Sequence, residues 1–221
     1  MDEQTLWYAF HLGRDGSGPH AGFEMVKTWR DDIGNRYCEH LVNFSGEHEG
    51  KEVRHNASCS FKLSRNGGRP IPVSIEYRDD SSDAKLVFDS GTLKASGTAT
   101  ENDGEPYPDD AMPGYAVQHL AATIATVEGA SINYTPVTEG NGKIDAPGSR
   151  LVNEGKTDKL LFPSKSKLWR VTDYTPDETP RSSFYFDDEG VLQQVDWNGA
   201  CSRLAASEEE AKPVLDEIPL E

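Results

Sequence analysis

Alternation of apolar and polar residues is the dominant pattern in this chain, and it predicts paired β-strands. The clearest hairpin has arms over residues 36–45 and 52–63, joined by a turn at 46–50. Successive strand residues point to opposite faces. One face of the first arm carries Cys38, His40, Val42 and Phe44, and one face of the second carries Val53, His55, Ala57, Cys59, Phe61 and Leu63. Pairing residues whose numbers sum to about 97 brings both sets to one face and places Cys38 opposite Cys59.

The same alternation predicts further strands along most of the chain. Turns rich in Gly, Asn and Asp separate them at intervals of roughly 8 to 12 residues, which is typical of an antiparallel meander. A second clear hairpin is predicted around the turn at 187–190. The predicted segments are 6–12, 22–30, 71–77, 85–88, 92–97, 131–138, 150–153, 160–162, 168–174, 182–186 and 191–197.

Two segments predict helices. Residues 115–127 contain neither Gly nor Pro, and their apolar residues recur at spacings of three and four. Ser207 and Glu210 form a capping box that predicts a short helix from Glu208 to about Leu215, weakened by Pro213. The Pro-, Asp- and Gly-rich residues 100–114 and the Gly-rich residues 139–149 predict long loops.

Together these elements predict a mainly β fold. We expect a single curved antiparallel sheet, a half-barrel or clam of about ten strands, with one long helix over residues 115–127 on its concave face. A chain of 221 residues can form this as one β-rich domain, which we place at residues 2–219. Met1, Leu220 and Glu221 are interpreted as residues added by cloning.

Charge narrows the choice of partners. The chain has 22 basic and 38 acidic residues and a net charge of −16. Nucleic acids and anionic membrane surfaces require clustered Lys and Arg, so both are excluded as expected partners. No stretch approaches the roughly 18 apolar residues of a membrane span, and we expect no insertion into a membrane.

The predicted hairpin places cysteine and histidine side chains together. Cys38, His40, His55 and Cys59 would share one face, which is a set that can bind zinc. Their spread over four strand positions and their apolar neighbours favour core packing instead, so we expect neither a metal nor a cofactor. Cys38 and Cys59 either form a disulfide or remain two buried thiols. The acidic stretch 101–110 lacks the first and last ligands of a calcium loop.

Aromatic residues are the candidates for ligand binding. A curved sheet can leave an aromatic-lined pocket for an apolar small molecule. The alternative is that the same rings form the core and that the helix fills the concavity. The residues are Trp7, Phe10, Trp29, Trp169, Phe184 and Phe186.

Several segments carry a resemblance to a known group of proteins. They are Trp7 and Tyr8, residues 21–23, 67–77, 86–98 and 169–171, and the run 184–190. Their order resembles exported bacterial β-meander proteins of unknown function whose curved sheet is similar to that of the lipoprotein carriers LolA and LolB. It also resembles β domains that accompany transglutaminase-like modules. The resemblance implies a periplasmic or otherwise exported location, with the signal segment removed, and transfers no catalytic residue.

The sequence contains no nucleophile elbow, no zinc-protease motif and no phosphate loop, so no catalytic residue is assigned. We therefore expect a non-enzymatic binding or scaffold domain, for an apolar ligand or for another envelope protein. The alternative is a carbohydrate-active hydrolase that uses an Asp/Glu pair on a β-sandwich, since two suitably spaced carboxylates suffice for glycoside hydrolysis.

Overall fold

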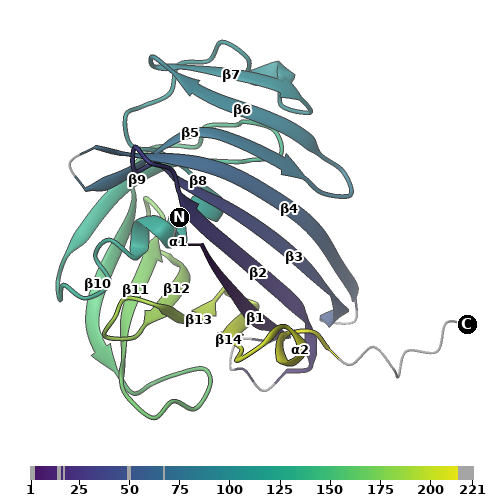
Figure 1. The fold of residues 1–221 in the computed structure, drawn as a ribbon, viewed down its shortest axis with the longest axis vertical. Helices are drawn as coiled ribbons and strands as arrows, with labels where there is room; N and C mark the ends of the chain where they lie inside the picture. The colour runs from purple at the N-terminus through teal and green to yellow at the C-terminus, as the bar shows by residue number, and fades with distance from the viewer. Residues whose placement is uncertain (1–2, 14–15, 17, 49–50, 67, 214–221) are drawn as a thin grey trace, which may run out of the picture.

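One sheet of 14 strands forms almost the whole molecule (Figure 1). The computed structural model describes residues 3–13, 16, 18–48, 51–66 and 68–213. The strands follow the order β7-β6-β5-β4-β3-β2-β1-β14-β13-β12-β11-β10-β9-β8. All neighbouring pairs are antiparallel except β8 and β9, which are parallel. The fold is therefore mainly β and built on one curved, open sheet, as the sequence predicted.

The elements fall into two runs of strands joined in space by the pairing of β1 with β14. The first run is β1 (Gln4–Leu12), β2 (His20–Arg30), β3 (Arg36–His48), β4 (Lys51–Asn66), β5 (Arg69–Arg78), β6 (Asp83–Asp89) and β7 (Thr92–Gly97). The second run is β8 (Ala111–Pro113), β9 (Ser131–Val137), β10 (Ser149–Thr157), β11 (Leu168–Tyr174), β12 (Pro180–Phe186), β13 (Leu192–Asp196) and β14 (Ala200–Leu204). The helices are α1 (Gly114–Ala121), α2 (Glu208–Ala211) and a 3-10 turn, Thr100–Asn102.

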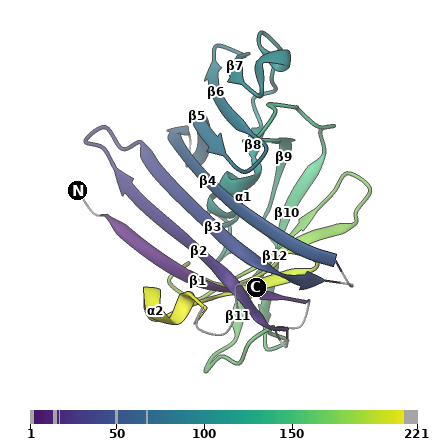
Figure 2. The ribbon, with the colours of Figure 1, turned by 90° about the vertical axis from the view of Figure 1, so that its right-hand side faces the viewer.

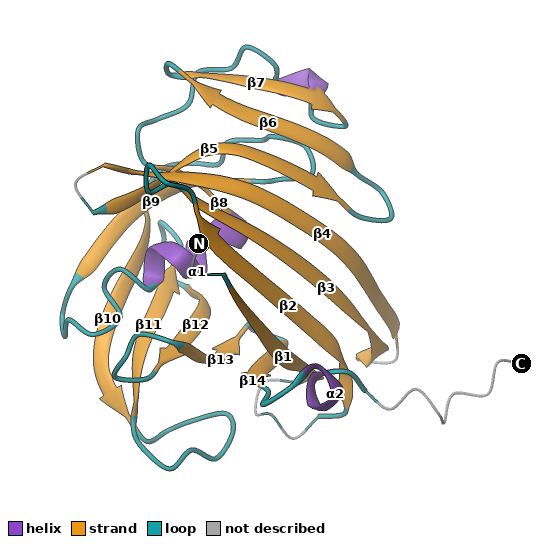
Figure 3. Ribbon diagram, in the orientation of Figure 1, coloured by secondary structure: helices purple, strands orange, loops and turns teal. Residues whose placement is uncertain are grey.

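The sheet curves until its two runs face each other across α1 (Figures 1 and 2). The guanidinium of Arg69, at the start of β5, spans the gap. It donates to the carbonyl oxygens of Asn133 at 3.0 Å and Asp110 at 3.3 Å. Figure 3 shows α1 inside the curve and α2 against the outside of the sheet. The inner face of the sheet and α1 therefore enclose the core.

Helix α1 is embedded in that core over all but its first two residues. Residues 116–121 are all buried, and Leu120 and Ala121 have no exposed surface. The helix has eight residues, so the prediction of a long helix over 115–127 is wrong. Beyond Ala121 the chain contains several β-branched residues, which favour helix less. The carbonyls of Ile124 and Ala125 accept from the buried amide of Asn153 on β10, and these bonds replace helical ones.

The number of strands was also underestimated. Residues 111–113 and 200–204 form β8 and β14, which the sequence analysis did not assign to strands. Conversely, residues 160–162 are not a strand. The backbone amides of Leu161 and Phe162 donate instead to the side-chain oxygen of Gln194 at 3.1 and 3.2 Å.

The β3–β4 hairpin forms with the predicted inner face but in a different register. Paired residues sum to 99, so Cys38 lies opposite Phe61 and His40 lies opposite Cys59. Pairing extends to His48 and Lys51, which moves the register by two positions. A shift of two keeps every side chain on its predicted face. It separates the two cysteines along the strands, and both are free, buried thiols rather than a disulfide. Burial raises the pKa of Cys38 to about 12.

The end of the described chain matches the predicted capping box. Ser207 caps α2, and its hydroxyl accepts from the backbone amide of Glu210 at 3.3 Å. The helix ends at Ala211, and Lys212 is already extended, so the predicted continuation of the helix toward Leu215 is wrong at Lys212 and Pro213. Residues 214 and 215 lie outside the described residues, as do Met1, Leu220 and Glu221. Within the described part of the chain, neither the length nor the hydropathy of any helix is sufficient for a membrane span.

Candidate functional site

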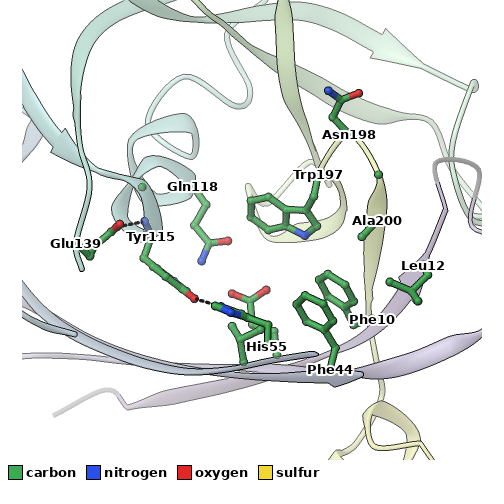
Figure 4. Close-up of a pocket in the computed structure, with 14 residues that line it drawn as sticks. Phe10, Leu12, Phe44, His55, Tyr115, Gln118, Glu139, Trp197, Asn198 and Ala200 are labelled. Carbon is green, nitrogen blue, oxygen red and sulfur yellow. Dashed lines mark hydrogen bonds between the residues drawn. The ribbon is translucent and has the colours of Figure 1, made fainter. Parts of the chain in front are cut away.

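A cavity of about 540 Å³ lies between α1 and the inner face of β1–β4 (Figure 4). Its size falls in the range of small-molecule sites, roughly 300–1,000 Å³. Apolar side chains from three strands, β1, β3 and β14, and from the turn between β13 and β14 form most of its wall, with polar groups gathered toward α1. The apolar residues are Phe10, Leu12, Val42, Phe44, Trp197 and Ala200.

The aromatic part of the wall depends on a glycine. Gly22 on β2 pairs with Phe10 on β1 and with Phe44 on β3. Because Gly22 has no side chain, the two phenyl rings stack across it, with centroids 4.4 Å apart and planes 6° apart. A Cβ at Gly22 would lie 2.0 Å from the carbonyl oxygen of Asn43 and 2.4 Å from the Cα of Phe44. The glycine therefore permits both the close approach of β3 and the stacked pair.

The cavity reaches solvent at the turn between β13 and β14. Trp197 is 37% exposed and Asn198 is also exposed, and both line the cavity. The indole of Trp197 packs at 89° against Phe184, with centroids 5.9 Å apart. Phe184 is itself fully buried, so it holds the indole at the mouth.

Two carboxyl groups and several hydrogen-bonding groups form the inner end. The first turn of α1 provides Tyr115, whose backbone amide donates to Oε1 of Glu139 at 2.7 Å. Its phenol lies 3.5 Å from Nε2 of His55 on β4. Gly114 leaves room for Glu139, since a Cβ there would lie 3.3 Å from Oε1. Figure 4 shows Tyr115, His55 and Gln118 pointing into one space.

Glu139 is buried, and burial raises the pKa of its carboxyl above the ordinary value of 4.5, against the hydrogen bonds from the backbone of Tyr115 and Gly114. The folded state therefore binds more protons than the unfolded state between pH 4.5 and this raised pKa. Stability contributed by the protonated carboxyl is present below pH 4.5 and is lost as the pH rises through that window.

This linkage gives a prediction for Glu139→Gln. The amide oxygen of Gln still accepts from Tyr115, and the side chain does not ionise. We expect the free energy of unfolding of the variant to increase relative to that of the wild type as the pH rises above 4.5. The difference should grow by at most about 1.4 kcal/mol per pH unit. Urea unfolding across this range measures the difference. Glu101→Gln, at an exposed carboxyl, should show no such gain, and an equal gain there would contradict the prediction.

A buried polar layer closes the cavity behind these groups. Oε1 of Glu24 lies 3.0 Å from Nδ1 of His40, and both side chains are at most 5% exposed. Nε2 of His40 lies 3.3 Å from Nε2 of His119 on α1. Burial, then the neighbouring His40 and Arg36, lowers the pKa of His119 well below its usual range, so its imidazole is neutral at pH 7. On the other side of this layer lies a smaller cavity of about 170 Å³, lined by Tyr8, Phe186 and others.

Gln118 belongs to both the layer and the cavity. Its Nε2 lies 3.2 Å from each ring nitrogen of His40. Its Oε1 is buried and finds no hydrogen-bond partner among the described residues, and the residue as a whole is 6% exposed. A buried acceptor without a partner is costly, so this atom is a candidate hydrogen-bond acceptor for a bound molecule.

The six aromatic residues predicted for ligand binding lie in different places. Phe10 lines the main cavity. Phe184 and Phe186 are 1% exposed and belong to the core around it. Trp169 packs at the edge of the core, and its Nε1 donates to Asp188 at 2.8 Å.

Trp7 and Trp29 lie on the opposite face of the sheet. Trp7 alternates with Leu6 and Tyr8, which point inward, and it contacts Phe23. Trp29 stacks on Tyr37, with centroids 5.5 Å apart. The cavity therefore brings together Phe10 with Phe44 and Trp197, and two of the six predicted residues face away from it.

The cysteine and histidine face serves packing and hydrogen bonding. His40 enters the polar layer, His55 lines the cavity, and Cys38 and Cys59 are buried thiols. The described residues contain no group of three or more His, Cys, Asp or Glu side chains arranged to hold a metal ion.

Comparison with known proteins identifies a fold. No family model matches the sequence, and no curated protein matches it either. A crystal structure of a beta-barrel-like protein of domain of unknown function DUF1849 from Brucella abortus is similar, with a TM-score of 0.55. The match covers 91% of this chain and 95% of that chain at 9% identity. The two proteins share a fold. At this identity the likeness carries the architecture alone, and the similarity to LolA and LolB stays a prediction.

Proposed function

We propose that this protein is a binding domain that holds an apolar small molecule in the cavity between α1 and β1–β4. The observation that carries the proposal is a cavity of about 540 Å³ with a mainly apolar wall and a polar inner end. This combination of apolar lining with a few convergent polar groups is typical of small-molecule sites. A side-chain-filled concave face would have favoured a scaffold instead.

The wall offers specific contacts for an apolar body. The stacked rings of Phe10 and Phe44 form one surface, and the indole of Trp197 lies near the mouth. Burying an apolar ligand here gains roughly 25 cal/mol for each Å² removed from water. The embedded helix α1 supplies the polar end, so a ligand would lie along the axis from Trp197 to Gln118.

Binding of N-phenyl-1-naphthylamine, whose fluorescence rises in apolar surroundings, tests this proposal. We expect saturable binding to the wild type. Ala200 lines the cavity beside Leu12, so Ala200→Trp should fill the space and weaken binding by about tenfold or more. Ala206→Trp is the matched control, because Ala206 is exposed and outside the cavity.

Equal binding by the two Trp variants would contradict the proposal, as would the absence of saturable binding to the wild type. The melting temperature of Ala200→Trp should be measured alongside, since only a folded variant tests the cavity. Val42→Phe, on the opposite wall, provides a second blocking variant.

An exported, periplasmic location is part of the same proposal. It is supported by the resemblance of the sequence to exported β-meander proteins and to the lipoprotein carriers LolA and LolB. In that setting the ligand would be an acyl chain or a similar envelope component. Fractionation of the native cells tests the location, and recovery in the cytoplasmic fraction would overturn it.

A second candidate function is glycoside hydrolysis. Two buried carboxyl groups, Glu24 and Glu139, line one cavity, and the raised pKa of Glu139 suits a general acid. Glu24, however, is already engaged by His40. Turnover of nitrophenyl glycosides that Glu139→Gln abolishes would favour the hydrolase, and no turnover over a broad panel would leave binding as the function.

A further inference from the structure

We propose that the ligand is an amphiphile whose head group donates hydrogen bonds and carries no negative charge, such as a primary amine or a hydroxyl. This inference rests on the proposed function and specifies the chemistry of its ligand. It is carried by the unpartnered oxygen of Gln118 together with the two carboxyl groups, Glu24 and Glu139, that line the same cavity.

The orientation of the Gln118 amide follows from its neighbours. Nδ1 of His40 lies 3.0 Å from the Glu24 carboxylate, and its N–H donates a hydrogen bond to that carboxylate. Nε2 of His40 then carries a lone pair, which faces the NH₂ of Gln118 at 3.2 Å and Nε2 of His119 at 3.3 Å. The amide oxygen of Gln118 is left without a partner, and Figure 4 shows the side chain directed from α1 into the cavity.

The other groups at this end also favour a donor. Glu24 and Glu139 offer carboxyl oxygens, and the phenol of Tyr115 is directed at His55. Among the described residues, no lysine or arginine lines the cavity. A carboxylate or phosphate head would therefore meet acceptors and negative charge, whereas a hydroxyl or ammonium would complete the hydrogen bonding. The net charge of −16 also disfavours a negatively charged head group.

Competition between head groups on one alkyl chain tests the inference. Dodecylamine, dodecanol and dodecanoate are titrated against protein carrying N-phenyl-1-naphthylamine, each below its solubility limit and, for the two ionic compounds, below the micelle concentration. We expect the amine and the alcohol to displace the probe at least about tenfold more tightly than the carboxylate. A tighter amine than alcohol assigns the selectivity to the carboxyl groups, and equal affinities assign it to hydrogen bonding by Gln118.

Two variants distinguish binding in the cavity from adsorption to the acidic surface of the protein. In Gln118→Met, which keeps the length of the side chain without its acceptor, the preference for the alcohol over the carboxylate should fall to less than about threefold. Ala200→Trp controls for adsorption. Amine binding that persists in Ala200→Trp belongs to the protein surface and would overturn the inference.

The two proposals fail in different ways. If the probe binds and dodecanoate displaces it as tightly as the amine and the alcohol, the head-group inference is wrong and the cavity function stands. If neither the probe nor any of the three amphiphiles binds, the proposed function fails and the inference fails with it.

Discussion

Replacing His40 by leucine should cost about 3–5 kcal/mol of stability, because it leaves the buried Glu24 carboxylate without a partner. The side chains of this pair lie on the neighbouring strands β2 and β3 and are at most 5% exposed. His40 also contacts His119 and Gln118 on α1. Removing its imidazole therefore also removes contacts to the helix that forms the inner end of the cavity. Urea unfolding at neutral pH measures the change.

A double variant identifies the cause of this loss. In Glu24→Leu/His40→Leu the buried carboxylate is removed together with the imidazole that binds it, and apolar replacements for buried pairs of this kind are often neutral. We expect the double variant to recover at least about half of the stability that His40→Leu loses. Glu76→Gln, which removes an exposed partner of Lys85, should change stability by less than about 1 kcal/mol. A double variant as unstable as the single one would show that packing, rather than the buried charge, sets the cost.

Gly22→Ala should cost about 3 kcal/mol and weaken ligand binding in the same protein. The added Cβ would lie 2.0 Å from the Asn43 carbonyl oxygen, which is backbone and cannot rotate away. Strand β3 must therefore shift, and the stack of Phe10 on Phe44 shifts with it. Urea unfolding and titration with N-phenyl-1-naphthylamine measure the two effects.

Ser58→Ala provides the comparison for Gly22→Ala, because Ser58 is exposed on the outer face of β4. It should change stability by no more than about 0.5 kcal/mol and leave the titration unchanged. A Gly22→Ala protein as stable as the wild type would show that β2 and β3 are less closely packed around the cavity than the structure indicates.

The fold was predictable wherever the alternation of residues was regular. The inner faces of β3 and β4 follow directly from it, and a register error of two left them intact. Elements that lack alternation were missed. The short β14 carries buried side chains at consecutive positions Cys201 and Ser202, so it gives no period-2 signal. The end of α1 depends on Asn153, which is 28 or more residues from the carbonyls that it binds. The sequence around the helix therefore does not indicate where the helix ends.

The site was harder to predict because its residues come from distant segments. Glu24, Gln118 and Glu139 converge only when β2, α1 and the segment after β9 fold together. One local signal was available. Gln118 and His119 interrupt an otherwise apolar segment, and buried polar residues of this kind mark a hydrogen-bonded layer or a site. Tryptophan content gave a weaker guide, because Trp7 and Trp29 lie on the outer face and Trp197 at the mouth.

Native mass spectrometry of the protein purified from its own host tests the central claim most directly. The account predicts a bound molecule that adds mass to the folded protein, leaves on denaturation, and is absent from Ala200→Trp purified in the same way. A molecule with an amine or hydroxyl head would agree with the groups at the inner end of the cavity. Repeated recovery of the wild-type protein at its ligand-free mass, with no saturable binding of N-phenyl-1-naphthylamine, would contradict the claim.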